Sequence, residues 1–305
     1  MLQILLSLLI VIFGVVYADV EDHLKKITDK SDAHKMRNID FIYMINLDQR
    51  PEKFAMCTER LSPYGVHPYR FSAVNGWELS LEAINDVGVK YEPWMTIGMG
   101  TRYLINGDKE PFHESVGVNG ITYFSHCMSR GAIGIVLSHL SILQDAWDSD
   151  YKTIWVMEDD VVPIRDPNLI SDYVDRLDAL VGENGWDVLF TDPDTKNNYG
   201  MYVPCTGFGW RPNFHPYDEG RFAERMDISA DFRKIGARFG AYSMIIRRSG
   251  IKKILNFIKN YQIFLPYDIE FALPNGIRLF SVKEDLISTQ PGALSDNGGP
   301  NYLKP

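Results

Sequence analysis

The sequence contains few cysteines and fewer basic than acidic residues. Its 305 residues include three cysteines, and 31 lysines and arginines stand against 40 aspartates and glutamates, giving a formal net charge of −9. Cys57, Cys127 and Cys205 lie far apart and form no CxxC pair, which excludes a clustered zinc site and a framework of several disulfides. Without a basic run to follow phosphates, nucleic-acid binding is not expected. The fold must depend on packing, for which 45% hydrophobic residues are ample.

The signatures of several common enzyme classes are absent as well. The chain has no GxSxG nucleophile elbow, no P-loop, no HExxH zinc motif and no GxGxxG dinucleotide motif. It also has no internal repeat and no low-complexity tract. These absences remove several rival classes of enzyme and leave an acidic globular protein that would need a local cation to handle anionic phosphates.

The N-terminal segment is uncharged and apolar. Residues 2–18 (LQILLSLLIVIFGVVYA) have the length of a signal-peptide core plus cleavage region, with Val16 and Ala18 at the small-residue positions. An uncleaved membrane anchor and a buried helix are the alternatives. The charged residues 19–38 predict a polar linker, so a single folded domain is expected over 39–305. We expect a protein that is exported, resides in a secretory-pathway lumen, or is anchored to a membrane through this segment.

Short apolar runs alternate with helical patterns along the rest of the chain. Strands are expected at Phe41–Leu47, Tyr69–Val74, Thr153–Met157, Asp187–Thr191 and Tyr242–Ile246. Helical spacing follows at residues 51–65, 131–147, 172–181 and 247–259. The alternation predicts an α/β fold with an open, mostly parallel central sheet and helices on both faces. Residues 80–130 and 193–240 lack a clear period and are expected to form loops or inserts that hold a second substrate.

The most informative motif is Glu158-Asp159-Asp160, directly after the expected strand Thr153–Met157. Ligands of open α/β sheets bind outside the carboxyl ends of the strands, where these three carboxylates would lie. Adjacent carboxylates repel one another unless a cation offsets their charge, and oxygen ligands favour Mg²⁺ or Mn²⁺ completed by substrate phosphates. A solvated acidic turn is the alternative interpretation of this motif.

Two further segments could contact an anionic ligand. Asn46-Leu47-Asp48-Gln49-Arg50 ends the first strand, where backbone groups can bind a nucleotide base and the Arg50 guanidinium can bind diphosphate oxygens. The helix that opens with Gly131-Ala132-Ile133-Gly134 has small residues and unpaired N–H groups at its start, and it continues through Ser138-His139. Arg50 could instead be a solvated charge, and His139 a hydrogen-bonded structural histidine.

Three other carboxylates are candidates for a catalytic base. They are Asp268, within LPYDIE, and Asp192 and Asp194, after the expected strand DVLFT. A base in this position would deprotonate an acceptor hydroxyl as it attacks, so its placement matters more than its resting pKa. Each of the three could also be a turn or capping residue.

Taken together, four segments resemble the motifs of glycosyltransferase family 25, the group of lipopolysaccharide-type and procollagen β-galactosyltransferases. They occur in the family's order: INLDQR, GAIGIVLSHLSIL, WVMEDDVVP and LPYDIEF. The resemblance covers roughly residues 39–296. It implies the nucleotide-sugar-binding fold called GT-A, and transfer of a sugar from a nucleotide diphosphate with inversion at the anomeric carbon.

The resemblance also implies roles for individual residues. The donor would be contacted by Asn46, Leu47, Arg50, Gly134, Ser138, His139, Glu158 and Asp159. Asp160, with Glu158, would hold Mn²⁺ or Mg²⁺. Asp268 is the first candidate for the catalytic base and Asp192 the second. Gln290, Ser295 and Asp296 resemble the family's C-terminal signature more loosely, and residues 80–130 are longer than the family pattern.

We therefore expect a metal-dependent inverting glycosyltransferase. It would move a hexose, galactose by family analogy, from a UDP-sugar to a hydroxyl of a glycan, lipopolysaccharide-type or glycoprotein acceptor. A divalent ion near the diphosphate would stabilise the charge of the leaving group. Two alternatives stay open: a metal-dependent nucleotidyltransferase or phosphoesterase with the same strand-end carboxylates, and a non-catalytic exported carbohydrate-binding protein.

Overall fold

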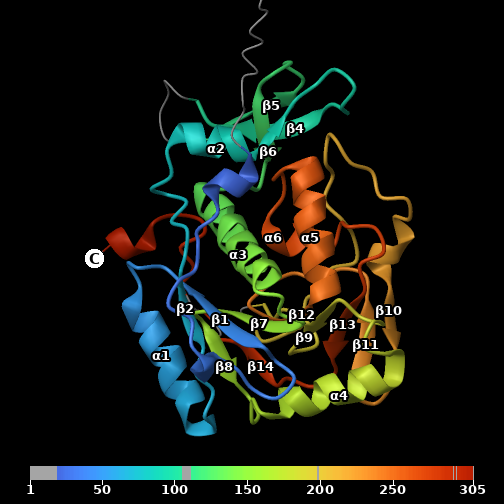
Figure 1. Ribbon diagram of the computed structural model, residues 1–305. Helices are drawn as coiled ribbons and strands as arrows, with labels where there is room; N and C mark the ends of the chain where they lie inside the picture. Colours follow the sequence, from blue (N-terminus) through green and yellow to red (C-terminus); the bar gives the residue numbers. More distant parts are fainter. Residues whose placement is uncertain (1–18, 105–110, 198, 291, 293, 305) are drawn as a thin grey trace, which may run out of the picture.

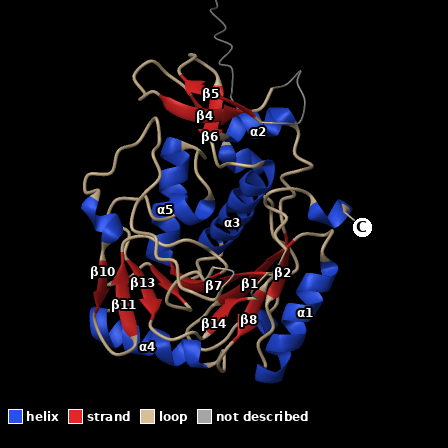
Figure 2. Cartoon of the chain, turned by 180° about the vertical axis from the view of Figure 1, so that it is seen from behind, coloured by secondary structure: helices blue, strands red, loops and turns tan. Residues whose placement is uncertain are grey.

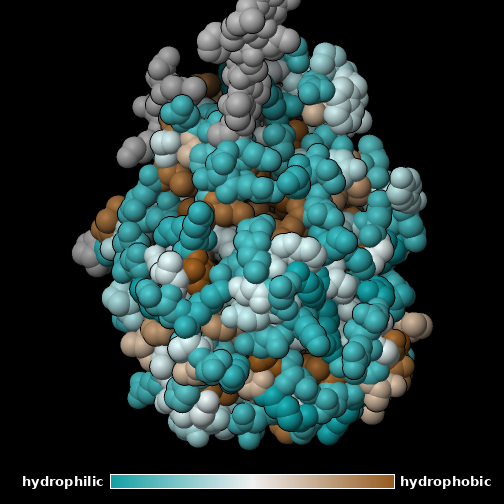
Figure 3. Space-filling view, viewed as in Figure 1, coloured by the Kyte–Doolittle hydropathy of each residue, from teal (hydrophilic) through white to brown (hydrophobic). Residues whose placement is uncertain are grey.

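The computed structural model describes residues 19–104, 111–197, 199–290, 292 and 294–304. The predicted signal peptide or membrane anchor, residues 1–18, lies outside this part of the chain. No helix within the described ranges is both long enough and apolar enough to cross a membrane. On the face shown in Figure 3 most of the surface is hydrophilic.

A large twisted sheet forms the centre of the molecule (Figure 2). From edge to edge its eight described strands are β10 (Arg225–Asp227), β11 (Phe232–Ile235), β13 (Leu279–Val282), β9 (Val188–Phe190), β12 (Ser243–Arg247), β7 (Thr153–Glu158), β1 (Phe41–Asn46) and β2 (Tyr69–Ser72). The α/β class expected from the sequence is confirmed. The sheet is mixed, however, because β12 runs antiparallel to both of its neighbours and β11 runs antiparallel to β10 and β13. Parallel pairing joins β1 to β2, β1 to β7, and β9 to β13.

Helices cover both faces of this sheet, as Figure 1 shows. One face carries α3 (Arg130–Asp148) and α5 (Arg248–Tyr261), and the other carries α1 (Pro51–Leu61) and α4 (Leu169–Val181). Strand β1 has both faces buried: Tyr43 and Ile45 pack with α3 and α5, whereas Ile42 and Met44 pack with α1 and α4. Burial on both sides explains why this strand is a continuous apolar run rather than an alternating one.

The two stretches without a clear sequence period contain short strands. Residues 80–130 include α2 (Leu81–Val87) and a second sheet of β3 (Val89–Lys90), β6 (Thr122–Ser125), β4 (Gly98–Arg102) and β5 (Phe112–Val116). Residues 193–240 include β10 and β11, which extend one edge of the central sheet. The strands β8 (Val161–Pro163) and β14 (Ile287–Thr289) form a separate ribbon. Strands of two to five residues are too short to give a recognisable period.

The segment for which we expect a polar linker, residues 19–38, lies against the folded domain. Its first short helix, η1 (Val20–His23), buries Val20 in the core. The Lys25 ammonium donates to the Ala73 carbonyl oxygen at 2.8 Å, and the Lys30 ammonium pairs with Asp145 of α3 at 2.8 Å. The lysines that suggested a solvated linker thus form contacts that fasten the segment to the domain.

Candidate active site

A cleft opens at the carboxyl ends of the parallel strands β1 and β7. Ile45 of β1 lies opposite Glu158 of β7, so the segments that follow the two strands meet at one edge of the sheet. The cleft holds about 690 Å³ of empty space, part of it open to solvent. Several residues predicted for the site line it: Leu47, Ser138, His139, Glu158, Asp159 and Asp160. Such a strand-end crevice is where α/β sheets bind ligands.

The carboxylates of Asp159 and Asp160 lie in unlike surroundings. Asp159 accepts a hydrogen bond from the Asn46 side-chain amide at 2.6 Å, and its other oxygen is 3.9 Å from the Lys53 ammonium. The Asp160 Oδ1 atom is buried and has no hydrogen-bond partner among the described residues. Burial raises the pKa of each to about 6 against the opposing effect of Lys53, and for Asp160 the charge of Glu158 adds to the increase.

Glu158 interacts with a buried histidine. The His139 Nε2 atom lies 3.2 Å from Glu158 Oε1, and the His139 ring stacks on Tyr267 with centroids 4.0 Å apart. Burial lowers the pKa of His139 to about 3, so this imidazole is neutral at physiological pH. Burial and the neighbouring charge of Asp268 raise the pKa of Glu158 to about 7. Stacking on Tyr267 therefore fixes the orientation of the His139 ring, so that an uncharged imidazole faces the Glu158 carboxylate.

Asp268 lies beside this pair, on the short helix α6 (Tyr267–Glu270). Its Oδ2 atom accepts a hydrogen bond from the Gly240 backbone N–H at 3.0 Å. Burial raises the pKa of Asp268, although hydrogen bonds from backbone N–H groups oppose the increase. Because its charge perturbs the pKa values of both His139 and Glu158, Asp268 belongs to the same electrostatic cluster as the cleft.

Asp192, the second candidate for the base, belongs instead to a closed buried network. Its side chain is fully buried, and its two oxygens contact Arg238, Tyr242 (2.5 Å) and Ser288 (2.9 Å). Both oxygens are thus engaged within the protein, and Asp192 links β9, the ribbon strand β14 and the Arg238 segment. Its role as the second candidate base stays a prediction. Asp194 is also buried, and it pairs with Arg225 at 2.8 Å.

Three of the predicted donor contacts have roles inside the fold. The Asn46 amide donates to Asp159 and to the Arg50 carbonyl oxygen, and its own oxygen accepts from Arg70. The Ser138 hydroxyl accepts from the Val74 N–H at 2.8 Å and donates to the Gly134 carbonyl at 2.7 Å.

A Cβ at Gly134 would lie 2.5 Å from the Val74 carbonyl oxygen and 2.6 Å from the Gly76 nitrogen. The small residue at this position therefore lets the residue 74–76 loop pack on α3. Asn46, Ser138 and Gly134 shape the cleft wall through contacts within the chain.

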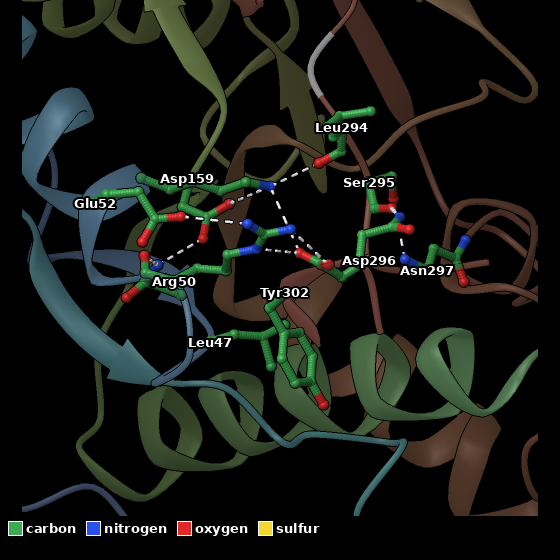
Figure 4. Close-up of polar contacts among 12 residues, drawn as sticks. Leu47, Arg50, Glu52, Asp159, Leu294, Ser295, Asp296, Asn297 and Tyr302 are labelled. Carbon is green, nitrogen blue, oxygen red and sulfur yellow. Dashed lines mark hydrogen bonds and ion pairs between the residues drawn. The ribbon is translucent and has the colours of Figure 1, made fainter. Parts of the chain in front are cut away.

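Arg50 faces a segment from the other end of the chain, as Figure 4 shows. Its Nε and Nη2 atoms each lie 2.9 Å from a different oxygen of Asp296. Lys53, one helical turn after Arg50, lies 3.9 Å from both Asp159 and Asp296. Lys53 belongs to none of the sequence motifs that predicted the site. A lysine three positions after Arg50, on the same face of a helix start, was the available signal.

The donor atoms of the cleft fit part of a divalent-metal shell. Glu158 and Asp160 offer oxygen ligands, which Mg²⁺ and Mn²⁺ prefer, and no described residue hydrogen-bonds to the Asp160 Oδ1 atom. Within the described ranges no group of three His, Cys, Asp or Glu residues is placed to hold a metal ion. One or two carboxylates from this chain would thus need a phosphate-bearing ligand and water to complete a shell, as is common for Mg²⁺.

Comparison with known proteins gives a consistent family match. The family model described as "Glycosyltransferase family 25 (LPS biosynthesis protein)" matches residues 39–270. A "Glycosyltransferase 25 family member" of Aedes aegypti is 27% identical over 172 residues, which is 56% of this chain and 24% of that protein. Another of the same name from Drosophila melanogaster is 29% identical over 140 residues, or 46% of this chain and 19% of that protein.

A mouse relative carries a different description. The "Inactive glycosyltransferase 25 family member 3" of Mus musculus is 24% identical over 153 residues, covering 50% of this chain and 21% of that protein. The matched segments thus span a quarter or less of these relatives' own lengths.

Proposed function

Because the chain belongs to glycosyltransferase family 25, we propose that it is an active inverting glycosyltransferase that uses a nucleotide-sugar donor. The observation that carries this proposal is the cleft at the ends of β1 and β7, where Glu158, Asp159 and Asp160 lie with Lys53, and where Arg50 pairs with the lining residue Asp296. An acidic protein that binds a diphosphate needs positive charge at the binding site, and Arg50 and Lys53 supply it. The relative named inactive makes catalysis the point to test.

We propose UDP-galactose as the donor, by family analogy, and a hydroxyl of a glycan, lipopolysaccharide-type or glycoprotein as the acceptor. Glu158 and Asp160 would hold Mn²⁺ or Mg²⁺ in a GT-A-like arrangement. The bound ion would supply positive charge against the negative charge that develops on the leaving diphosphate. Asp160 suits this role because it has a buried oxygen to which none of the described residues hydrogen-bonds.

Asp268 would accept the proton of the attacking acceptor hydroxyl at a carboxylate oxygen. Its Oδ2 atom is held by the Gly240 N–H, which orients the group. Its raised pKa makes it a better base than an exposed aspartate. The neutral His139, stacked on Tyr267, would keep Glu158 in place without adding a charge beside the reacting sugar.

The experiment that tests the function follows the products. Purified residues 19–305 are incubated with a panel of sugar nucleotides, Mn²⁺ and glycan acceptors, and the released nucleotide is identified by mass spectrometry. A glycosyltransferase releases a nucleoside diphosphate and extends the acceptor. Release of a nucleoside monophosphate or inorganic phosphate would indicate a nucleotidyltransferase or phosphoesterase. Glycan binding with no product and no response to Mn²⁺ or UDP would indicate a non-catalytic carbohydrate-binding protein.

The compartment is a linked proposal. Nucleotide sugars are supplied in the cytosol and in secretory-pathway lumens. If residues 2–18 direct export, we propose that the protein acts in such a lumen, either free or held at the membrane by this segment. Expression of the full chain in a eukaryotic cell, followed by fractionation and N-terminal sequencing, distinguishes cleavage from anchoring.

A further inference from the structure

Part of the cleft wall comes from residues 295–297, whose Asp296 carboxylate faces the cations Arg50 and Lys53. Arg50 and Lys53 project from the start of α1, and their side chains are each 17% exposed. The Asp296 carboxylate lies against both, with its side chain 7% exposed. Figure 4 shows Asp296 beside Arg50, next to Ser295 and Asn297 of the same segment. Arg50 and Lys53 thus already bind an anionic group, and another anion could bind in its place.

The geometry at Asp296 is that of anion recognition by a guanidinium. Two parallel hydrogen bonds of 2.9 Å join Arg50 Nε and Nη2 to the two carboxylate oxygens. The same planar fork matches two oxygens of a phosphate. The Lys53 ammonium stands 3.9 Å from Asp296 and donates at 2.9 Å to the Leu294 carbonyl oxygen. The segment therefore places a carboxylate and a carbonyl oxygen on the two cations, as a phosphate chain would place its oxygens.

Asp296 is the carboxylate that Arg50 and Lys53 share. Each cation also has a second carboxylate nearby, Glu52 at 3.5 Å from Arg50 and Asp159 at 3.9 Å from Lys53. A diphosphate carries more negative charge than one carboxylate and can bridge both cations. A bound diphosphate could therefore replace Asp296 without leaving Arg50 or Lys53 unpaired.

The segment is held by contacts that can be exchanged for water. The Trp77 indole N–H donates to the Asp296 carbonyl at 2.8 Å, and the Asn75 amide donates to the Tyr302 hydroxyl at 2.8 Å. Ser129 donates to Asn297 at the start of α3. These are isolated side-chain hydrogen bonds, each of which adds only modestly to stability. Leu294 and Leu303 are each 72% exposed in the docked segment, so docking buries neither of these apolar side chains.

We propose that Arg50 and Lys53 form the binding site for the donor's diphosphate, and that Asp296, with residues 294–303, occupies this site until the donor displaces it. The C-terminal segment is then a built-in competitor of the donor. The inference rests on the proposed function for the identity of the ligand. Arg50 and Lys53 can bind a diphosphate only while residues 294–303 are displaced. A substitution that weakens the contacts of this segment should therefore strengthen diphosphate binding.

The first test measures binding of inorganic pyrophosphate, with Mg²⁺ present, by calorimetry. Asp296→Asn should bind pyrophosphate about 5- to 10-fold more tightly than the wild type, and Lys53→Gln at least 10-fold more weakly. Glu52→Gln is the matched control, because Glu52 also faces Arg50, at 3.5 Å, but its side chain is 58% exposed. Its affinity should stay within about twofold of the wild type. Unchanged or weaker binding by Asp296→Asn, or unchanged binding by Lys53→Gln, overturns the proposal.

A second variant separates displacement from a simple change of charge. Tyr302→Phe removes the hydrogen bond from Asn75 and leaves Arg50, Lys53 and Asp296 intact. It should tighten pyrophosphate binding about 2- to 3-fold if the segment must leave. Hydrogen exchange followed by mass spectrometry supplies a direct readout, since the amides of residues 294–303 should exchange faster when pyrophosphate is bound. Slower exchange would mean that the segment closes over the ligand, which contradicts displacement.

These outcomes are distinct from those of the functional test. If pyrophosphate binding follows the predicted order but no sugar transfer is found, the anion site stands and the proposed function fails. If sugar transfer is found while Asp296→Asn and Tyr302→Phe leave pyrophosphate affinity unchanged, the function stands and the competing segment is refuted.

Discussion

Replacing Asp160 by asparagine should stabilise the metal-free protein while abolishing sugar transfer. Asp160 has a buried oxygen that finds no partner in the part of the chain that the structure describes, and it lies close enough to Glu158 for the two charges to repel. Ionised Asp160 is therefore costly for the fold in the absence of a cation. A residue kept at the expense of stability is typical of a functional site, so opposite effects on stability and activity are the expected signature of a metal ligand.

The size of the effect follows from the pKa of Asp160. Its ordinary value is 3.8 and its value in the folded protein is about 6, which corresponds to about 3 kcal/mol at neutral pH. The asparagine amide brings its own unpaired polar group, so the expected net gain is about 1 to 2 kcal/mol. For a chain of this size, that is a rise of roughly 2 to 3 °C in Tm.

The dependence on pH has a definite sign. Folding raises the pKa of Asp160, which means that the ionised carboxylate is less stable in the folded protein than in the unfolded chain. The wild type therefore loses stability as the pH rises from 3.8 to about 6 and Asp160 ionises. The advantage of Asp160→Asn should thus be absent at the acid end of this window, where the carboxyl is protonated in both states. It should grow through the window and be complete above it.

The assay is calorimetric unfolding in EDTA across this pH range, together with initial rates of transfer in Mn²⁺. Asp32→Asn is the control, because it makes the same chemical change on a side chain that is 93% exposed, and it should alter neither Tm nor rate. A variant at Asp160 that is less stable than the wild type in EDTA at pH 7.5 would refute the argument from burial. Full turnover at saturating donor would refute the metal role.

Further substitutions separate catalysis from folding. Asp268→Asn should reduce turnover at least 100-fold with donor affinity unchanged, measured by single-turnover kinetics and calorimetry; an unchanged rate would exclude it as the base. Asp192→Asn should lower the free energy of unfolding by about 3 kcal/mol in urea titrations because it leaves the buried Arg238 without its counter-charge, and an effect on turnover alone would contradict its assignment to the fold. Gly134→Ala should cost about 2 kcal/mol or more, since its Cβ would lie 2.5 Å from the Val74 carbonyl oxygen; wild-type stability would show that the 74–76 loop moves freely.

Much of the architecture was predictable from local patterns. The apolar run at Phe41–Asn46, the helical stripe of α3 and the apolar strand that ends at Glu158 all appear at their predicted places. The family resemblance, drawn from four motifs, is confirmed by the match over residues 39–270. The direction of β12 and the edge strands β10 and β11 were not predictable, because strand direction and short pairings depend on partners far along the chain.

For the candidate site too, some features were predictable from the sequence and others were decided only by the folded structure. The sequence alone determined that three carboxylates follow a buried strand, because apolar spacing and the position of charge are local properties. Tertiary structure decided which carboxylates are accessible: Asp192 is enclosed by Arg238, whereas Asp268 joins the cluster around Glu158. It also brought together Arg50 and Asp296, which lie 246 positions apart. The free energy of an ion pair depends on distance and burial, and these quantities exist only once the chain has folded.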